Sequence, residues 1–78
     1  MERRHAKLDR ITFDPNKCEG KACIRGLRFP VSTLVGYLAS GLSIEQLLAE
    51  WPDLEADDVR QALAYAAWSV TERVLEVA

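Results

Sequence analysis

Residues 20–31, GKACIRGLRFPV, decide the fold of this chain, because its character changes across them. Before them lies a polar, basic segment with few helix signals, and after them apolar residues recur at helical spacing. Gly20 and Gly26 tolerate positive φ, so we predict turns at Glu19-Gly20 and Gly26-Leu27. The runs 22–25 and 28–31 favour extended backbone, and Pro30 keeps the second of them extended to its end. The stretch therefore predicts a small β-meander.

The segment before this stretch supplies one further strand. Residues 11–13, Ile-Thr-Phe, are β-branched and aromatic, and Asp14-Pro15-Asn16 predicts a turn after them. Residues 1–10 show no strong periodicity, so we expect a flexible basic tail in which His5 is solvated. The single folded domain is then expected over residues 11–78.

Three helices are predicted after the meander. The first is capped by Ser32 and stopped near Gly41, and the second begins at Ser43, with Gln46 completing a capping box, and closes before Pro52. The third should run from about residue 56 to residue 77. Its spacing predicts one heptad-like seam that faces a neighbouring helix. The seam consists of Val59, Leu63, Ala66, Val70, Val74 and Val77.

Apolar residues also occupy the opposite side of this last helix, where Ala64, Trp68 and Leu75 share a face. A helix in so small a domain is not expected to bury both faces within its own chain. We therefore predict that these three residues form a subunit or partner interface. The alternative is a Trp68 ring folded over the surface of its own helix.

The expected fold is mainly α, a short β-hairpin or meander followed by three helices in a helix-turn-helix bundle of homeodomain-like or winged-helix-like type. In such a bundle the third helix would meet DNA, yet it begins Glu55-Ala56-Asp57-Asp58. Carboxylates at that position oppose phosphate contact. Any operator contact is therefore expected from the basic N-terminal half.

Composition and charge narrow the function class. A chain of 78 residues makes one small domain with a marginal core, so a homodimer or a protein partner is expected. Two cysteines and a charged N-terminus without an apolar run indicate a cytoplasmic protein with no signal peptide. No uncharged run is long and uninterrupted enough for a membrane span.

The net charge of −2 conceals two unlike halves. Residues 1–30 hold eight Lys or Arg and four acids, a net +4, and residues 31–78 hold two and eight, a net −6. Within the basic half, Lys21, Arg25 and Arg28 are candidate contacts for DNA or for an acidic partner. Arg25 and Arg28 flank one turn, where like charges repel each other, so an anionic group should offset them. The alternative is internal pairing with Asp14, Glu19 or the acidic helical half.

Catalysis and metal binding are not expected. The single His lies in the tail, no nucleophile–base pair stands at strand or helix spacing, and Cys18 and Cys23 lack two further ligands for zinc. The adjacent Asp57 and Asp58 point in different directions on a helix. We therefore predict a protein that is not an enzyme and has no cofactor.

An ordered series of motifs resembles the bacterial and archaeal family called domain of unknown function 433. The series runs through residues 10–67 and comprises Asp14-Pro15, Gly20-Lys21, the run 23–28 (CIRGLR), Pro30-Val31, the run 38–43 (LASGLS), Glu45, Leu48, the run 52–54 (PDL), the run 57–59 (DDV) and the run 62–66 (ALAYA). The chain departs from the family pattern at Ala22, where Pro is common, and at Glu55, where Ser or Thr often caps the last helix.

The resemblance implies a small helix-turn-helix-like protein that acts as the antitoxin of a type II toxin–antitoxin pair. Its partner would be a PIN-like nuclease toxin, with operator DNA as a second target, and the family offers no catalytic residues to transfer. The alternatives are a stand-alone DNA-binding transcriptional regulator and a dimeric protein-interaction adaptor. Salt dependence separates the regulator from the others, because each phosphate contact steepens the loss of affinity with salt.

Overall fold

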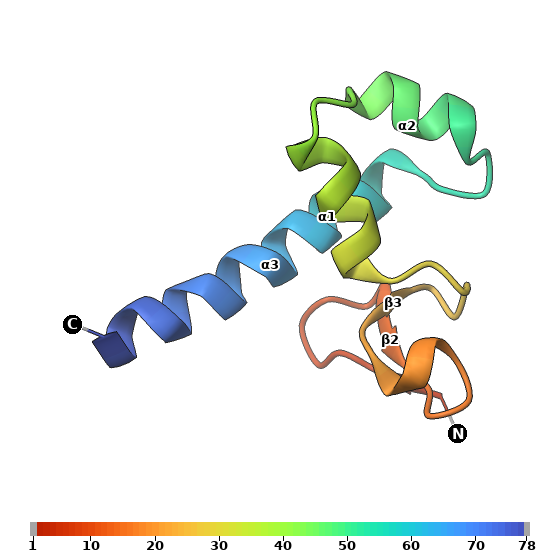
Figure 1. Ribbon diagram of the computed structural model, residues 1–78. Coiled ribbons are helices and arrows are strands. Elements are labelled where there is room, and N and C mark those ends of the chain that lie inside the picture. Colours follow the sequence, from red (N-terminus) through yellow and green to blue (C-terminus); the bar gives the residue numbers. More distant parts are fainter. Residues whose placement is uncertain (1, 78) are drawn as a thin grey trace.

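The computed structural model describes the backbone of residues 2–77 and the side chains of residues 2–70. A small antiparallel sheet precedes three helices, so the chain is mainly helical, as expected (Figure 1). The elements are β1 (Arg3–Arg4), β2 (Ile11–Phe13), the 3-10 turn η1 (Cys18–Gly20), β3 (Cys23–Ile24), α1 (Val31–Ala39), α2 (Ile44–Glu50) and α3 (Ala56–Val77). Figure 1 shows α3 running beneath α1 and extending well beyond the other elements.

The sheet has the order β1-β2-β3, with β2 in the centre. Arg3 pairs with Phe13 on one side, and Ile11 pairs with Ile24 on the other. Two expectations are corrected here. Residues 3–4 form a strand where we expected a tail, and the run 28–31 contributes only an isolated bridge, from Pro30 to Cys23. The proline has no N–H to extend a ladder, and α1 already starts at the next residue.

The turn after β3 has Arg25 and Gly26 at its centre, one residue before the predicted Gly26-Leu27. Arg25 and Gly26 both have positive φ, 44° and 72°, and Leu27 N donates to Ile24 O at 2.7 Å. Positive φ at both central residues is what a type I′ turn requires. The turn before β3 is less regular, because Cys18, Glu19 and Gly20 all have positive φ. Backbone strain is thus concentrated on both sides of β3.

The ends of α1 and α2 follow the expected signals with one correction. Pro30, not Ser32, is the N-cap of α1, and no side chain caps that end. At the other end Gly41 N donates to Leu38 O and Leu42 N to Tyr37 O, the paired bonds of a Schellman motif with Gly41 at φ 106°. The predicted capping box of α2 is confirmed, since Ser43 Oγ accepts from Gln46 N and Gln46 Oε1 accepts from Ser43 N.

The core lies where the sheet, α1 and α2 meet the first half of α3. Its buried apolar residues are Ile11, Ile24, Val31, Leu34, Leu47, Leu54, Val59 and Ala62. The seam predicted along α3 is correct only at its start. Val59 is buried, but Leu63 and Val70 are 42% and 58% exposed. The packed side of α3 continues through Ala62 and Tyr65 instead, so these two residues lie beside it. The Val74 and Val77 side chains lie outside the described residues.

None of the helices in the described part of the chain combines the length and the apolar character that crossing a bilayer requires.

Candidate functional site

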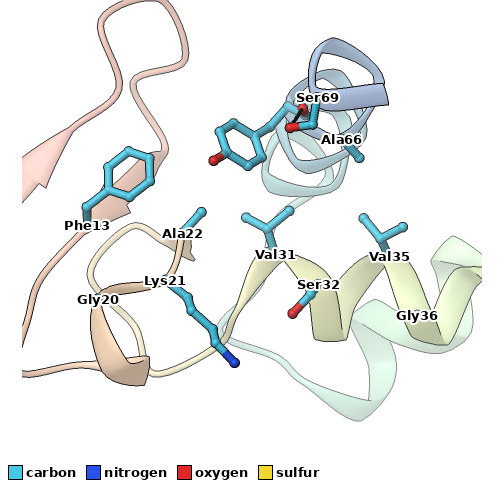
Figure 2. A pocket seen from close by; sticks show the side chains of 11 residues that line it. Phe13, Gly20, Lys21, Ala22, Val31, Ser32, Val35, Gly36, Ala66 and Ser69 are labelled. Carbon is cyan, nitrogen blue, oxygen red and sulfur yellow. Dashed lines mark hydrogen bonds between the residues drawn. The ribbon is translucent and has the colours of Figure 1, made fainter. Parts of the chain in front are cut away.

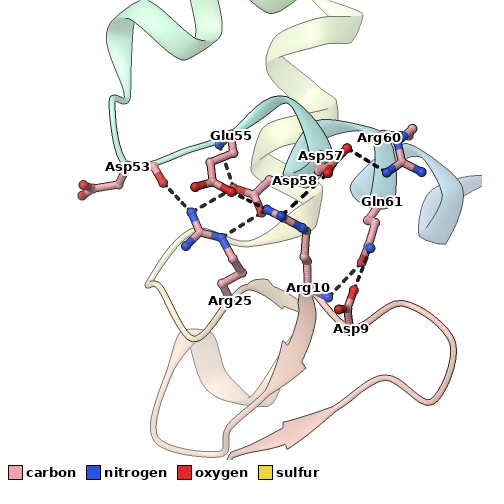
Figure 3. Close-up of polar contacts among 9 residues, drawn as sticks. All are labelled: Asp9, Arg10, Arg25, Asp53, Glu55, Asp57, Asp58, Arg60 and Gln61. Carbon is pink, nitrogen blue, oxygen red and sulfur yellow. Dashed lines mark hydrogen bonds and ion pairs between the residues drawn. The ribbon is translucent and has the colours of Figure 1, made fainter.

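A buried carboxylate, Asp58, joins the sheet to the start of α3 (Figure 3). Arg25 donates to it twice, from Nε to Oδ1 at 2.9 Å and from Nη2 to Oδ2 at 3.0 Å. Arg10 Nη1 donates to the same Oδ1 at 2.9 Å and to Glu55 Oε1 at 2.7 Å. Arg10 directly precedes β2 and Arg25 directly follows β3, so the two arginines lie at the same end of this antiparallel pair, where Arg25 N donates to Arg10 O at 2.7 Å. The aspartate comes from the first turn of α3. Residues 10, 25 and 58 are called the Asp58 cluster below.

Asp58 also caps its own helix. Its Oδ2 accepts from Glu55 N at 2.8 Å, which is one half of a capping box. The other half is absent, because Glu55 replaces the Ser or Thr that would return the bond. Burial alone would raise the pKa of Asp58, but hydrogen bonds from Arg25, Arg10 and Glu55 outweigh it, so the pKa of this carboxyl lies below its ordinary value.

Arg10 and Arg25 both pair with acidic side chains of the same chain. The hydrogen bond to Glu55, followed by the one to Asp58, raises the pKa of Arg10, and the bond to Asp58 raises the pKa of Arg25. Gln61 reinforces the junction, since its Oε1 accepts from Arg10 N at 2.8 Å and its Nε2 donates to Asp9 Oδ1 at 2.8 Å. The Asp58 cluster therefore has the chemistry of a structural clamp between sheet and helix.

The three basic candidates do not form one patch. Arg25 is engaged in the Asp58 cluster, which is the internal pairing that the sequence left open as an alternative. Lys21 is exposed at the edge of an apolar groove, where its Nζ lies 3.9 Å from Glu19 Oε1. Arg28 is exposed beside Trp51 and Asp53, next to the start of α3. Of the three, only Arg25 pairs with a buried acid.

The apolar face of α3 is exposed as far as its side chains are described. Ala64 is exposed, and Trp68 is 58% exposed although its ring lies 6.1 Å from Tyr65 and 6.2 Å from His5. The Leu75 side chain lies outside the described residues. The expectation of a solvated His5 is wrong, because His5 is half-buried and its Nδ1 accepts from Lys7 N and Leu8 N. His5 thus ties the N-terminal segment to α3.

A groove of about 640 Å³ runs between the sheet, α1 and α3 (Figure 2). Figure 2 shows Val31 and Val35 of α1 pointing toward Ala66 and Ser69 of α3. The remaining lining residues are Phe13, Gly20, Lys21, Ala22, Ser32, Gly36 and Tyr65. Many of the lining side chains are small, so the backbone of another segment could come close to the surface of the groove.

Cys18 is the first residue of η1 and Cys23 is the first residue of β3, and their side chains interact with each other. Cys23 is buried, and burial, followed by the contact with Cys18, raises the pKa of the Cys23 thiol to about 12. A thiol with so high a pKa is a weak nucleophile at neutral pH. Among the described side chains no three His, Cys, Asp or Glu gather as metal ligands.

Sequence reasoning missed Asp58 and Arg10 as a pair. The available signal was the position of Asp58, three residues after the N-cap Glu55. A carboxylate at that position can accept a hydrogen bond from the N-cap N–H, and a negative charge is favourable in the first turn of a helix. Nothing in the spacing of residues 10, 25 and 58 shows that they meet, because their contact depends on how the sheet packs on α3.

A family model and a solved structure point to the same family. The family described as "Protein of unknown function (DUF433)" matches residues 11–66. The uncharacterized protein y4eO of Sinorhizobium fredii (strain NBRC 101917 / NGR234) is 38% identical over 56 residues, 72% of this chain. The chain spans only 25% of the length of that curated relative. A crystal structure of a DUF433 member protein from Anabaena variabilis ATCC 29413 is 37% identical, with a TM-score of 0.75, over 87% of this chain and 67% of that one.

Proposed function

This chain belongs to the DUF433 family, and from that premise we propose that it is the antitoxin of a type II toxin–antitoxin pair. It would neutralise a PIN-like nuclease toxin by direct protein–protein contact, with Ala64, Trp68 and Leu75 as part of the contact surface. The observation that supports this most is the exposed, uncharged run of α3. Between residues 63 and 70 the helix has no charged residue, and on this face Ala64 is exposed and Trp68 is 58% exposed.

An uncharged helical surface of this kind suits a protein partner better than a nucleic acid. Fully desolvated aromatic side chains contribute most to protein interfaces, and Trp is prominent among them. Trp68 is already held by Tyr65 and His5, so little side-chain entropy would be lost when a partner covers it. A nuclease toxin also presents an acidic, metal-binding site, for which the outward charges of Lys21 and Arg28 are suitable contacts.

Operator binding is the second activity in the proposal, in a helix-turn-helix-like arrangement of α1, α2 and α3. The first turn of α3 gives it little support. Asp57 is exposed there, and Asp58 is held by two arginines that are consequently not available to phosphates. DNA contact would have to come from exposed cations on the sheet side, namely Arg3, Arg4, Lys7 and Lys21, together with Arg28. The protein contact is therefore the primary activity that we propose.

The direct test pairs this protein with the product of its adjacent gene. If that product carries the spaced Asp and Glu residues of a PIN-like nuclease, co-expression should restore growth, and the purified pair should elute as one complex in size-exclusion chromatography. The complex should also suppress metal-dependent RNA cleavage by the toxin. Trp68→Ser should weaken the complex at least about tenfold, since a hot-spot side chain is worth 2 kcal/mol or more.

Ile44→Asp is the matched control, because Ile44 is an apolar residue of α2 with similar exposure, 45%, away from the α3 surface. It should leave the complex and the inhibition unchanged. An adjacent product that lacks the acidic set would overturn the proposal. So would a nuclease that keeps full activity with a stoichiometric excess of this protein.

A further inference from the structure

Cys18 and Cys23 are two thiols close together in the fold, and the proposed contact with a toxin uses neither of them. Cys18 is half-buried, Cys23 is only 2% exposed, and each thiol is a hydrogen-bond partner of the other. We propose that they form a redox-sensitive pair, which a low-molecular-weight disulfide converts into an intramolecular disulfide between Cys18 and Cys23. The inference rests on the two thiols alone and does not depend on a toxin.

The backbone between the two residues turns back on itself. Cys18, Glu19 and Gly20 have φ values of 51°, 56° and 79°, and left-handed backbone is unfavourable for the two of them that carry a Cβ. Two hydrogen bonds hold this turn, since Gly20 N donates to Lys17 O and Lys21 N donates to Cys18 O, both at 3.0 Å. The turn thereby places the Cys18 side chain against Cys23.

Cys23 is fixed in the sheet on both sides. It pairs with Thr12 of β2 and forms an isolated bridge with Pro30. A zinc site needs about four ligands, and in the part of the chain whose side chains are described no group of three His, Cys, Asp or Glu gathers anywhere. The contact between Cys18 and Cys23 therefore has the chemistry of a dithiol.

The exposure of the two thiols sets the order of the reaction. The Cys18 thiolate, which solvent reaches, attacks one sulfur of the small disulfide, so that a mixed disulfide forms on Cys18 and one small thiolate leaves. The Cys23 sulfur then loses its proton and attacks the Cys18 sulfur, and the second small thiolate leaves and takes up a proton. The two protein thiols lose two electrons and two protons, which reduce the small disulfide to two thiols.

Burial also determines how the disulfide is reduced. A reductant has to attack the accessible Cys18 sulfur, because Cys23 is covered, so the Cys23 sulfur is the leaving group. Burial is the largest of the causes that raise the pKa of the Cys23 thiol, although the charge of Lys17 lowers it. Thiols with a high pKa leave slowly. The disulfide should therefore resist reduction once it has formed.

The bond would also fix the segment between the two cysteines. This segment carries Gly20, Lys21 and Ala22, which line the groove in Figure 2. Val31 N donates to Ala22 O at 2.9 Å, so the same segment is tied to the start of α1. Because a cross-link restricts the unfolded chain, the oxidised protein should unfold at a higher urea concentration than the reduced protein.

Mass spectrometry of the full chain tests the inference. Incubation with oxidised glutathione should leave no free thiol and a chain lighter by two hydrogen atoms. Trypsin cleaves after Lys17, Lys21 and Arg25, so the disulfide should join the fragments 18–21 and 22–25. Cys23→Ala should stop at a mixed disulfide on Cys18, and Cys18→Ala should form its mixed disulfide at least about tenfold more slowly, because its remaining thiol is buried. Circular dichroism verifies that each variant is folded.

Reduction provides a comparison at the same sulfur. Dithiothreitol should reduce the oxidised wild-type chain at least about tenfold more slowly than it reduces the mixed disulfide on Cys18 of Cys23→Ala, because glutathione is the better leaving thiol. A wild-type chain that keeps both thiols or stops at the mixed disulfide would overturn the inference. So would a disulfide that joins two chains through Cys18, since Cys23 would then take no part.

Discussion

At the scale of single residues, Asp58 is the polar group on which the packing of the sheet against α3 depends. Replacing it with Asn removes the charge that faces Arg10 and Arg25, so Arg25 loses its carboxylate partner, while Arg10 keeps Glu55. Because both guanidinium groups keep partial solvent access, we expect Asp58→Asn to cost about 2–3 kcal/mol, below the range for fully buried pairs. Urea denaturation measures the loss. Asp57→Asn, at an exposed position, should change stability by less than about 0.5 kcal/mol.

The pH dependence of stability follows from the same residue. The pKa of Asp58 is lower in the folded chain than in the unfolded one, so the unfolded state binds its proton first as pH falls. The stabilisation is present above about pH 4 and is lost as the pH falls through the folded pKa, which lies below that value. Wild-type protein should therefore lose stability as the pH falls below about 4, and Asp58→Asn should lose less. Equal acid sensitivity of the two proteins would contradict this assignment.

At the scale of elements, helix ends set the stability of α1 and α2. Ser43 caps α2 with both bonds of its capping box in place, so Ser43→Ala should cost about 1 kcal/mol. Ser32 makes no cap in the structure, since it lies inside α1, and Ser32→Ala should be within about 0.5 kcal/mol of wild type. Thermal unfolding of the two variants compares them directly. A larger loss for Ser32→Ala would show that the sequence-based cap was the correct one.

Two glycines of the same helical segment should respond in opposite directions to alanine. Gly36 lies inside α1 with helical backbone and free space around it, so Gly36→Ala should stabilise the chain by about 0.5–1 kcal/mol. Gly41 has φ 106° in the Schellman turn, where Ala is strained, so Gly41→Ala should destabilise by about 1 kcal/mol or more. Both values come from chemical denaturation at low protein concentration, where self-association does not contribute.

Local signals predicted most of these elements correctly. The capping box of α2, the Gly41 stop and the span of α3 depend on residues close together in sequence, and the structure has all three. The sheet was harder, because β1 has only two residues, Arg3–Arg4, and no apolar alternation. Its pairing with β2 is a long-range contact for which a two-residue strand carries no pattern.

The site shows the same division between local and long-range information. The exposure of Ala64 and Trp68 follows from helical spacing and chain length, both of which the sequence contains. The Asp58 cluster cannot be derived from helical spacing or chain length, because Arg10, Arg25 and Asp58 meet only after β2, β3 and α3 have packed together. Sequence alone placed Arg25 among candidates for an external anion, with internal pairing as the alternative. Its anion in the structure is Asp58.

At the scale of the whole molecule, the division of charge bears on nucleic-acid binding. Arg10, Arg25 and Arg60 each pair with an acid, which leaves five other exposed cations among the described residues, namely Arg3, Arg4, Lys7, Lys21 and Arg28. Arg28 lines a different hollow from Lys21. Each phosphate neutralised adds about 0.9 to the salt slope of the binding constant for duplex DNA. The chain alone should therefore bind DNA with a slope no steeper than about −4.5, and with little sequence preference.

Fluorescence anisotropy with operator and unrelated duplexes, from about 50 to 200 mM salt, measures this slope. Lys21→Ala should lower its magnitude by about one unit, whereas Arg25→Ala should not lower it, because that guanidinium already serves Asp58. A steep slope with a strong preference for the operator would favour the stand-alone regulator over the antitoxin. A slope that Arg25→Ala reduces would show that the clamp opens on DNA. The effect of Arg25→Ala on the salt slope thus decides whether Arg25 serves the fold alone or also contacts a phosphate backbone.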